Sequence, residues 1–182
     1  MTDRDMMRSD VDLIGEIAAG DQSALRALYE RHRGPLLAFL KSKCGDAELA
    51  ADAAQDAMIE VWTSASKFSG KSSPKTWMFA IARNKLVDRL RKDARLTVVE
   101  EPPEVVDDAP DPTVVIARAQ DATRVRACLA NLSESHRSVI ELAFFHELKY
   151  EEIAEVEGAP LGTIKTRIYH AKKLLMRCLG ER

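Results

Sequence analysis

A helix-turn-helix pattern within Ser133–Cys178 constrains the fold of this chain more than any other stretch. A short helical pattern runs from Tyr150 to Glu157, and a longer one follows Pro160. Between them, Gly158 tolerates positive φ and Pro160 suits a helix start, which predicts a tight turn. A short helix, a turn and a second helix form the helix-turn-helix arrangement. The second helix has apolar residues at i, i+4, i+7 and i+11, which predict one buried stripe: Ile164, Ile168, Ala171 and Leu175.

The charge of this segment changes sign at the turn. Five glutamates lie between Glu147 and Glu157, whereas Glu181 is the only acidic residue from Lys165 onward. A basic helix in the major groove meets phosphates on both sides. Helix-turn-helix geometry also occurs as plain packing, and a basic face is often only solvated, but the segregation of charge favours DNA binding. The candidate contacts are Thr163, Lys165, Thr166, Arg167, His170 and Lys173, with Lys172 also expected on the polar faces.

The composition indicates an all-α protein. Alanine and leucine abound, and glycine and proline are sparse outside a few breaks. A chain of 182 residues could be one domain or two small ones. Its 27 Lys+Arg nearly balance its 29 Asp+Glu, so charge must be partitioned between segments of opposite sign.

Several functional classes are not expected. The three cysteines, Cys44, Cys128 and Cys178, are far apart and odd in number, which predicts reduced thiols and no disulfide framework. Scattered histidines without metal-ligand spacing predict no metal site and no cofactor. No nucleophile–base constellation or phosphate loop suggests an enzyme. A polar N-terminus and the lack of a membrane-length apolar stretch predict a cytoplasmic protein without membrane insertion.

Three helices are expected in the first part of the chain, over Asp10–Ala19, Ser23–Cys44 and Ala47–Ser66. Pro35 should kink or divide the second of them. Asp21 or Ser23 can cap that helix, and Gly45-Asp46 supplies the next stop and cap. The third helix has an acidic surface, which either serves solubility alone or forms a docking face for a basic or polar partner helix.

A basic segment follows, with a loop at Phe68–Pro74 and a helix at Lys75–Asp93. From Lys71 to Arg95 there are eight cations and two acids, so 8 − 2 gives a charge of +6. Cations interleaved with aromatic residues suit single-stranded nucleic acid, which needs stacking surfaces as well as phosphate contacts. The alternative is that Trp77 is simply part of the core.

The next stretch, residues 96–112, contains four prolines and six acidic residues and is predicted to be a flexible acidic linker. We therefore expect a first helical domain at 1–95 and a second at 113–182. The second should begin with a helix over Thr113–Leu132, ahead of the helix-turn-helix.

Three motifs together resemble the extracytoplasmic-function (ECF) sigma factors of bacterial RNA polymerase. The family's core-polymerase-binding helix is similar to AADAAQDAMIEVW, from Ala50 to Trp62. Its minus-ten loop and helix resemble FSGKSSPKTWMFAIARNKLVDRLRK, from Phe68 to Lys92. Its minus-thirty-five domain resembles the segment from Leu132 to Leu175. The chain departs from the family at Ala51, where glutamate is frequent, and at Lys149, where a small capping residue is usual.

The resemblance implies a non-enzymatic subunit that directs polymerase to specific, stress-responsive promoters. It implies core RNA polymerase, promoter DNA and an anti-sigma factor as partners, the last zinc-binding in a subgroup of the family. Polymerase contacts are then expected at Asp52, Gln55 and Asp56. Minus-thirty-five contacts are expected on the basic helix described above. Minus-ten contacts are expected at Phe68, Ser69, Gly70, Lys71, Ser72, Ser73, Lys75, Trp77 and Asn84.

A different class of protein remains open at this point. A two-domain helix-turn-helix regulator would bind DNA without docking on core polymerase. Such a regulator is expected to form a dimer and to recognise a palindromic site. Co-elution with core polymerase distinguishes the two classes.

Overall fold

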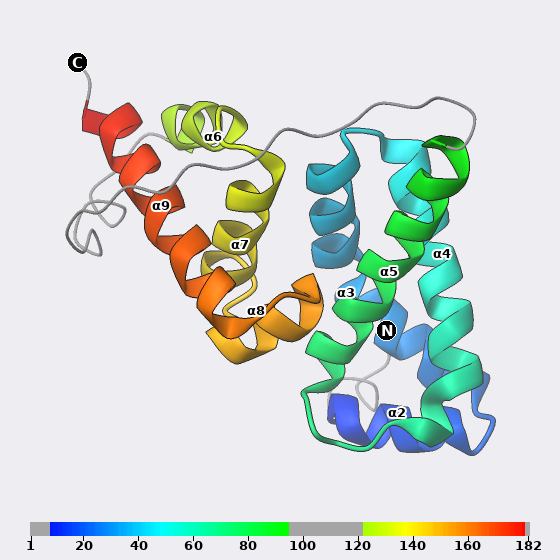
Figure 1. The fold of residues 1–182 in the computed structure, drawn as a ribbon. Coiled ribbons are helices and arrows are strands. Elements are labelled where there is room, and N and C mark those ends of the chain that lie inside the picture. Colours follow the sequence, from blue (N-terminus) through cyan, green and yellow to red (C-terminus); the bar gives the residue numbers. More distant parts are fainter. Residues whose placement is uncertain (1–7, 95–121, 181–182) are drawn as a thin grey trace. The chain divides into compact units, whose positions relative to one another are not determined.

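The computed structural model describes residues 8–94 and 122–180 of the chain (Figure 1). All regular secondary structure in these two ranges is helical, which confirms the predicted fold class. The chain divides into two compact units, the first containing α2–α5 and the second α6–α9. Residues 155–158 complete helix α8 and the turn after it, so they are continuous with the helix-turn-helix of the second unit. The predicted linker at 96–112, and residues 113–121 of the helix predicted after it, lie outside the described residues, so both stay predictions.

The first unit consists of four helices and a short 3-10 turn. Local capping determines where each helix begins. The hydroxyl of Ser9 and the side chain of Asp12 form a capping box at the start of α2. Asp21 and Asp46 accept backbone N–H bonds at the starts of α3 and α4, as predicted. The elements are α2 (Asp10–Ala18), α3 (Gln22–Cys44), α4 (Ala47–Ser64), η1 (Ala65–Lys67) and α5 (Pro74–Ala94).

Helix α3 is continuous through Pro35, so the structure contradicts a division at that residue. A proline inside a helix removes one backbone hydrogen bond and costs about 3 kcal/mol. Leu28 before the proline and Leu36, Phe39 and Leu40 after it are all buried. Because packing on both sides of Pro35 holds the two halves in place, tertiary contacts outweigh the local penalty.

Small side chains let α4 approach its neighbours closely. Ala50, Ala53, Ala54 and Ala57 are each at most 1% exposed and form the buried face of the helix. Helix α4 ends at Ser64, two residues earlier than expected, because Ala65–Lys67 tighten into the 3-10 turn. This packing leaves the opposite face of α4 available to solvent.

Helix α2 is tied to α3 through Asp10. One carboxylate oxygen lies 2.5 Å from Nη1 of Arg31, and the other lies 2.7 Å from Nε2 of His32. A second guanidinium nitrogen of Arg31 donates to the carbonyl of Arg8 at 3.0 Å. Leu13 and Ile17, on the same short helix, are buried. The polar ties therefore orient α2, and its apolar face holds it against the bundle.

Asp10→Asn is expected to lower the free energy of unfolding by about 1–2 kcal/mol at neutral pH, since an amide replaces two charge-assisted hydrogen bonds poorly. The hydrogen bond with His32 is the main cause that holds the pKa of Asp10 below its ordinary value. A carboxylate with a lowered pKa stabilises the fold above its unfolded-state pKa of about 4, and this contribution is lost as pH falls through the folded-state pKa. Thermal unfolding of wild type and variant should therefore differ at neutral pH and converge in acid. A difference that stays constant down to about pH 2 would contradict this account.

The second unit contains the predicted helix-turn-helix. Helix α8 (Tyr150–Glu157) has the predicted bounds, and Gly158 has the expected positive φ of 60°. The predicted stripe of α9 is confirmed, because its four residues are each at most 3% exposed. The helices are α6 (Ala122–Ala130), α7 (Glu134–Phe144), α8 and α9 (Leu161–Gly180).

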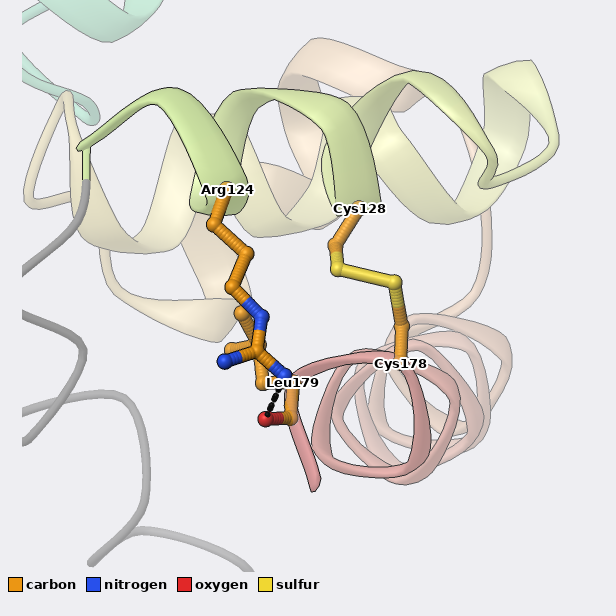
Figure 2. Close-up of a disulfide and its surroundings, with 4 residues drawn as sticks. All are labelled: Arg124, Cys128, Cys178 and Leu179. Carbon is orange, nitrogen blue, oxygen red and sulfur yellow. Dashed lines mark hydrogen bonds between the residues drawn. A yellow bond between two sulfur atoms is a disulfide. The ribbon is translucent and has the colours of Figure 1, made fainter. Parts of the chain in front are cut away.

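The expectation that all three cysteines are reduced thiols is wrong. Cys128 on α6 and Cys178 near the end of α9 form a disulfide, while Cys44 is free (Figure 2). The two residues are 50 positions apart in the chain, but their Cα atoms lie 5.9 Å apart. Packing of α6 against α9 creates this proximity, which residue spacing alone does not reveal.

Candidate nucleic-acid interface

One line of polar residues follows the face of α9 that is opposite its buried stripe. We call it the α9 row; its members are spaced i, i+3, i+7 and i+10 and are Thr163, Thr166, His170 and Lys173. At 3.6 residues per turn these positions share one side of the helix. Lys165 and Arg167 flank the row on its two sides. Within the described ranges, no ion pair engages Lys165, Arg167 or Lys173, so their charges are available to an anionic ligand.

Two members of the α9 row are held by the unit itself. The hydroxyl of Thr166 donates to the carbonyl of Gly162 at 3.0 Å. The His170 ring lies 5.3 Å from the ring of Tyr169 and 6.4 Å from that of His136, measured between centroids. Such contacts limit the rotation of both side chains and preorganise the row.

Lys172 does not belong to the polar faces, contrary to expectation. It is only 8% exposed, and its ammonium lies 5.5 Å from the centroid of the Phe144 ring. A cation above an aromatic face is stabilised electrostatically, and the lysine stem adds apolar contact. Lys172 therefore joins α9 to α7 and is not a candidate DNA contact.

The unusual residue before α8 is compensated in the structure. The backbone N–H of Lys149 donates to Oε2 of Glu152 at 2.9 Å. In a capping box, the side chain at the third helical position accepts the backbone N–H of the residue before the helix, and Glu152 does this for Lys149. Helix α8 thus keeps a defined start although Lys149 lacks the hydroxyl that would complete the box.

The loop before α5 contains residues with structural roles and residues that are exposed. The Ser73 hydroxyl accepts the backbone N–H of Thr76 at 3.1 Å and so caps α5. The rings of Phe68 and Trp77 pack with their centroids 5.1 Å apart. These contacts anchor both ends of the loop. The residues left exposed are Ser69, Gly70 and Lys71, whereas Ser72 and Lys75 are partly exposed.

Asn84 is exposed on α5, opposite the buried residues Met78, Ala82 and Leu86. It is seven residues after Trp77, which places both on one side of the helix. In the described part of the chain, the hydrogen bond to its side chain comes from Nη1 of Arg83 at 3.5 Å, near the limit for such a bond. The alternative that Asn84 serves to bond a neighbouring helix is therefore not supported, and its amide can pair with a ligand.

Two cations of α5 that were expected to contact nucleic acid, Lys85 and Arg89, instead pair with acidic residues of α4. Lys85 pairs with Glu60 at 3.0 Å. Arg89 bridges two acids of α4, with Nε 2.7 Å from Asp56 and Nη1 2.8 Å from Asp52. The hydrogen bond from Arg89 is the main cause that lowers the pKa of Asp56. Lys85 and Arg89 therefore join α5 to α4 and are not on the side of Asn84.

The outer face of α4 combines polar residues with one apolar side chain. We call Asp52, Gln55 and Ile59 the α4 surface; they follow each other at i, i+3 and i+7, opposite the buried alanines. Asp56 lies at its edge and faces Arg89. Ile59 is 56% exposed and was missed at the sequence level. Its position outside the apolar stripe of α4 was the signal that could have revealed it.

The described residues do not gather any group of three or more His, Cys, Asp or Glu suited to a metal ion. Likewise, none of the helices in the described ranges has both the length and the apolar character needed to cross a membrane.

Helices α8 and α9 form a helix-turn-helix, an arrangement typical of DNA-binding proteins. The sigma-70 region 2 family model matches residues 28–96, and the sigma-70 region 4 model matches residues 122–175. The ECF RNA polymerase sigma factor RpoE of Cereibacter sphaeroides is 38% identical over 81% of this chain and 82% of its own length. The ECF sigma factor SigK of Mycobacterium bovis is 32% identical over 98% of both chains. This chain belongs to the ECF RNA polymerase sigma factors.

Two solved structures are similar to the chain as well. The sigma factor RpoE from Bartonella quintana, in complex with the anti-sigma factor NepR, is 27% identical with a TM-score of 0.62, over 84% of this chain and 94% of that one. CnrH, in complex with the cytosolic domain of CnrY, is 26% identical with a TM-score of 0.64, over 94% of this chain and 97% of that one.

Proposed function

We propose that this sigma factor docks on core RNA polymerase through the α4 surface and reads two promoter elements, one with each unit. The observation that carries the proposal is that the described residues include two different surfaces. One is the α9 row, which, with the flanking Lys165 and Arg167, presents cations that no ion pair within the described ranges engages; the other is the partly apolar α4 surface. The chain performs no catalysis itself and acts in the bacterial cytoplasm, where promoters and polymerase are found. Its promoters are those of a stress response.

Duplex recognition is assigned to α9. A helix in the major groove offers polar side chains to base edges and cations to the flanking phosphates. The α9 row supplies the former, and Lys165 and Arg167 flank it where phosphates would lie. Arginine can also pair with guanine through two hydrogen bonds. Arg167 is therefore either a base contact or a phosphate contact at the edge of the row.

Arg167→Ala is expected to weaken binding to the minus-thirty-five duplex by about 1–3 kcal/mol if the residue pairs with a base, with relaxed preference at that position. A phosphate contact would instead weaken binding to all sequences alike and reduce the salt dependence. Titration of labelled duplexes at several salt concentrations separates the two. Lys172→Ala is no suitable control because Lys172 is buried, so Arg177→Ala, further along α9, serves instead. Unchanged affinity after Arg167→Ala would remove the residue from the site.

Single-strand recognition is assigned to the loop before α5 and to Asn84. Bases that are unpaired during promoter opening expose edges and faces, which bind to amides and aromatic rings. The exposed Asn84 amide and the partly exposed Trp77 lie on one side of α5. The loop adds the exposed hydroxyl of Ser69, and it adds Gly70, whose φ of 68° suits glycine.

An anti-sigma factor is proposed as the regulatory partner. Two similar structures support this: RpoE from Bartonella quintana is in complex with the anti-sigma factor NepR, and CnrH is in complex with the cytosolic domain of CnrY. The α4 surface offers such a partner a side chain, Ile59, that is apolar and unpacked. That the partner binds zinc stays a prediction.

The experiment that tests the proposed function mixes the purified chain with core polymerase. Co-elution and run-off transcription from a promoter library are expected, with transcripts that core polymerase alone does not produce. A helix-turn-helix regulator acting alone would remain separate from core polymerase and would bind a palindromic duplex as a dimer. That result would overturn the proposal.

A further inference from the structure

The disulfide lies in a part of the second unit that DNA recognition does not use. We infer that Cys128 and Cys178 are a reversible dithiol–disulfide pair whose redox state sets how firmly α6 is held against α9, and thereby the affinity of the second unit for duplex DNA. The DNA part of this inference rests on the proposed function. The redox and stability parts depend only on the described residues.

Figure 2 shows the contact between the two helices. Cys128 is 3% exposed and belongs to an apolar cluster with Leu129, Ile140 and Leu175, against which Cys178 packs. Beside the disulfide, Nη2 of Arg124 donates to the carbonyl of Leu179 at 2.7 Å. The end of α9 is thus joined to α6 by a covalent bond, a hydrogen bond and apolar packing.

Helix α6 depends on this junction. The structure describes nine of its residues, Ala122–Ala130, and short helical segments in proteins are held mainly by tertiary packing of their apolar face. The disulfide closes a loop between residues 50 positions apart, which contains α7, α8 and most of α9. In the loop-entropy model, closing a loop of this size shifts the unfolding equilibrium about 1,000-fold toward the folded state. Reduction should therefore release α6 first.

The surroundings of the sulfur atoms permit reversal. As thiols, both cysteines can remain in the apolar cluster, because a protonated cysteine packs as a small apolar side chain. Cys178 is less buried than Cys128, so it is the cysteine that an attacking thiolate reaches more easily. A sigma factor works among reducing thiol buffers, where protein disulfides are usually transient and redox-sensing.

Glutathione disulfide represents the class of oxidant required, a low-molecular-weight disulfide. The Cys178 thiolate attacks one of its sulfur atoms, the S–S bond of the oxidant breaks, and one glutathione leaves as its thiolate. The Cys128 thiolate then attacks the Cys178 sulfur and expels the second glutathione. The two cysteines lose two electrons and two protons in total, and the oxidant becomes two glutathione thiols.

The effect on DNA binding is transmitted through α9. Cys178 is 178 − 173 = 5 residues beyond Lys173, the last member of the α9 row, which is about 7.5 Å along the helix axis. The disulfide therefore lies beyond the end of the row and acts on it through the helix. Loss of α6 leaves the last turns of α9 less supported, while α7 still packs against this helix. We therefore expect a loss of a few-fold in DNA affinity and a larger change in stability.

The first arm of the test equilibrates the full chain with series of reduced and oxidised glutathione, then alkylates free thiols and determines the mass. Cys128 and Cys178 should convert together, the oxidised fraction falling from nine-tenths to one-tenth over about an 80-fold change in [GSH]²/[GSSG]. Cys44→Ala is the matched control and should titrate identically. A pair that stays bonded, or stays reduced, across the whole series overturns the inference.

The second arm compares hydrogen exchange and thermal unfolding of the two states. Reduction should accelerate exchange in α6 at least 10-fold, leave α4 unchanged, and lower the melting temperature of the second unit by roughly 15–30 °C. Cys178→Ala should behave like the reduced protein in either buffer. Should that variant not fold, the reduced wild type provides the same comparison. Equal α6 exchange in both states contradicts the inference.

The third arm measures affinity for the minus-thirty-five duplex in both states. A few-fold weaker binding of the reduced chain supports the inference. Equal binding, with the expected change in α6 exchange, overturns its DNA part. Absence of binding in both states rejects the proposed function instead, and the first two arms still decide the redox pair.

Discussion

Charge reversal of Asp52 and Asp56 to lysine is expected to lower affinity for core polymerase about 100-fold, roughly 3 kcal/mol, while the first unit stays folded. Both carboxylates lie at the α4 surface, and both are bonded to Arg89. A partner that pairs with them would meet two cations in the variant. Because exposed ion pairs contribute only about 0–1 kcal/mol each, losing the bonds to Arg89 should change stability little.

Arg89→Gln separates docking from intramolecular pairing. This substitution removes the cation but leaves both carboxylates on the α4 surface. If the carboxylates contact polymerase, Arg89→Gln should co-elute with it as the wild type does. If Arg89→Gln lost as much binding as the double lysine variant, polymerase would recognise Arg89 itself or the way in which Arg89 holds Asp52 and Asp56.

Gel filtration with core polymerase and thermal unfolding of the free chain provide the two measurements. The prediction requires a large change in the first and a small change in the second. Full co-elution of the double lysine variant would place the docking surface elsewhere. Ile59→Ala extends the test to the apolar part of the α4 surface, where lost burial should weaken binding without altering charge.

Asn84→Ala is expected to reduce open-complex formation about 10-fold or more and to remove the preference for one base of the minus-ten element. An amide can donate and accept at once, as the edge of an unpaired base requires, and methyl cannot. Extruding a base costs a few kcal/mol, which contacts of this kind must offset. Asn84 is exposed and weakly bonded, so thermal stability should change by less than about 0.5 kcal/mol.

Asp88→Ala is the matched control for this prediction. Asp88 is exposed on the same helix, one turn after Asn84, and is not among the proposed contacts. Asn84→Asp removes the donor and keeps the acceptor, so it should change which base is preferred. Permanganate footprinting of promoters with each base at the minus-ten positions measures both effects. Intact base preference in Asn84→Ala, or its unfolding, would make Asn84 structural.

The helix-turn-helix could be predicted closely because its signals are local. The bounds of α8, the positive φ of Gly158 and the buried stripe of α9 all depend on residues within a few turns of one another. The caps at Asp21 and Asp46 are local for the same reason. The exposed face of α9 was largely predictable, since it consists of the positions on the side of the helix opposite the apolar stripe.

Contacts between helices could not be predicted in the same way. Lysine is usually a surface residue, but the ammonium of Lys172 lies over the ring of Phe144 because α7 packs against α9. Arg89 was counted among the cations for nucleic acid, although two carboxylates on the neighbouring helix engage it. Both errors concern long cationic side chains. Such a side chain can extend to a partner on a neighbouring helix, so its role depends on which helix packs beside it.

The sequence by itself determined the helical class, the starts of α3, α4 and α8, and the spacing that identifies an ECF sigma factor, because capping and periodicity act over about four residues. Only the tertiary structure decided that α3 continues through Pro35, that Arg89 lies between Asp52 and Asp56, and that Cys128 meets Cys178. Arg89 and Asp52 are 37 positions apart in the chain, and the two cysteines are 50 positions apart. Such residues approach each other only when whole helix faces pack, and that packing depends on the summed burial of the core rather than on any local pattern.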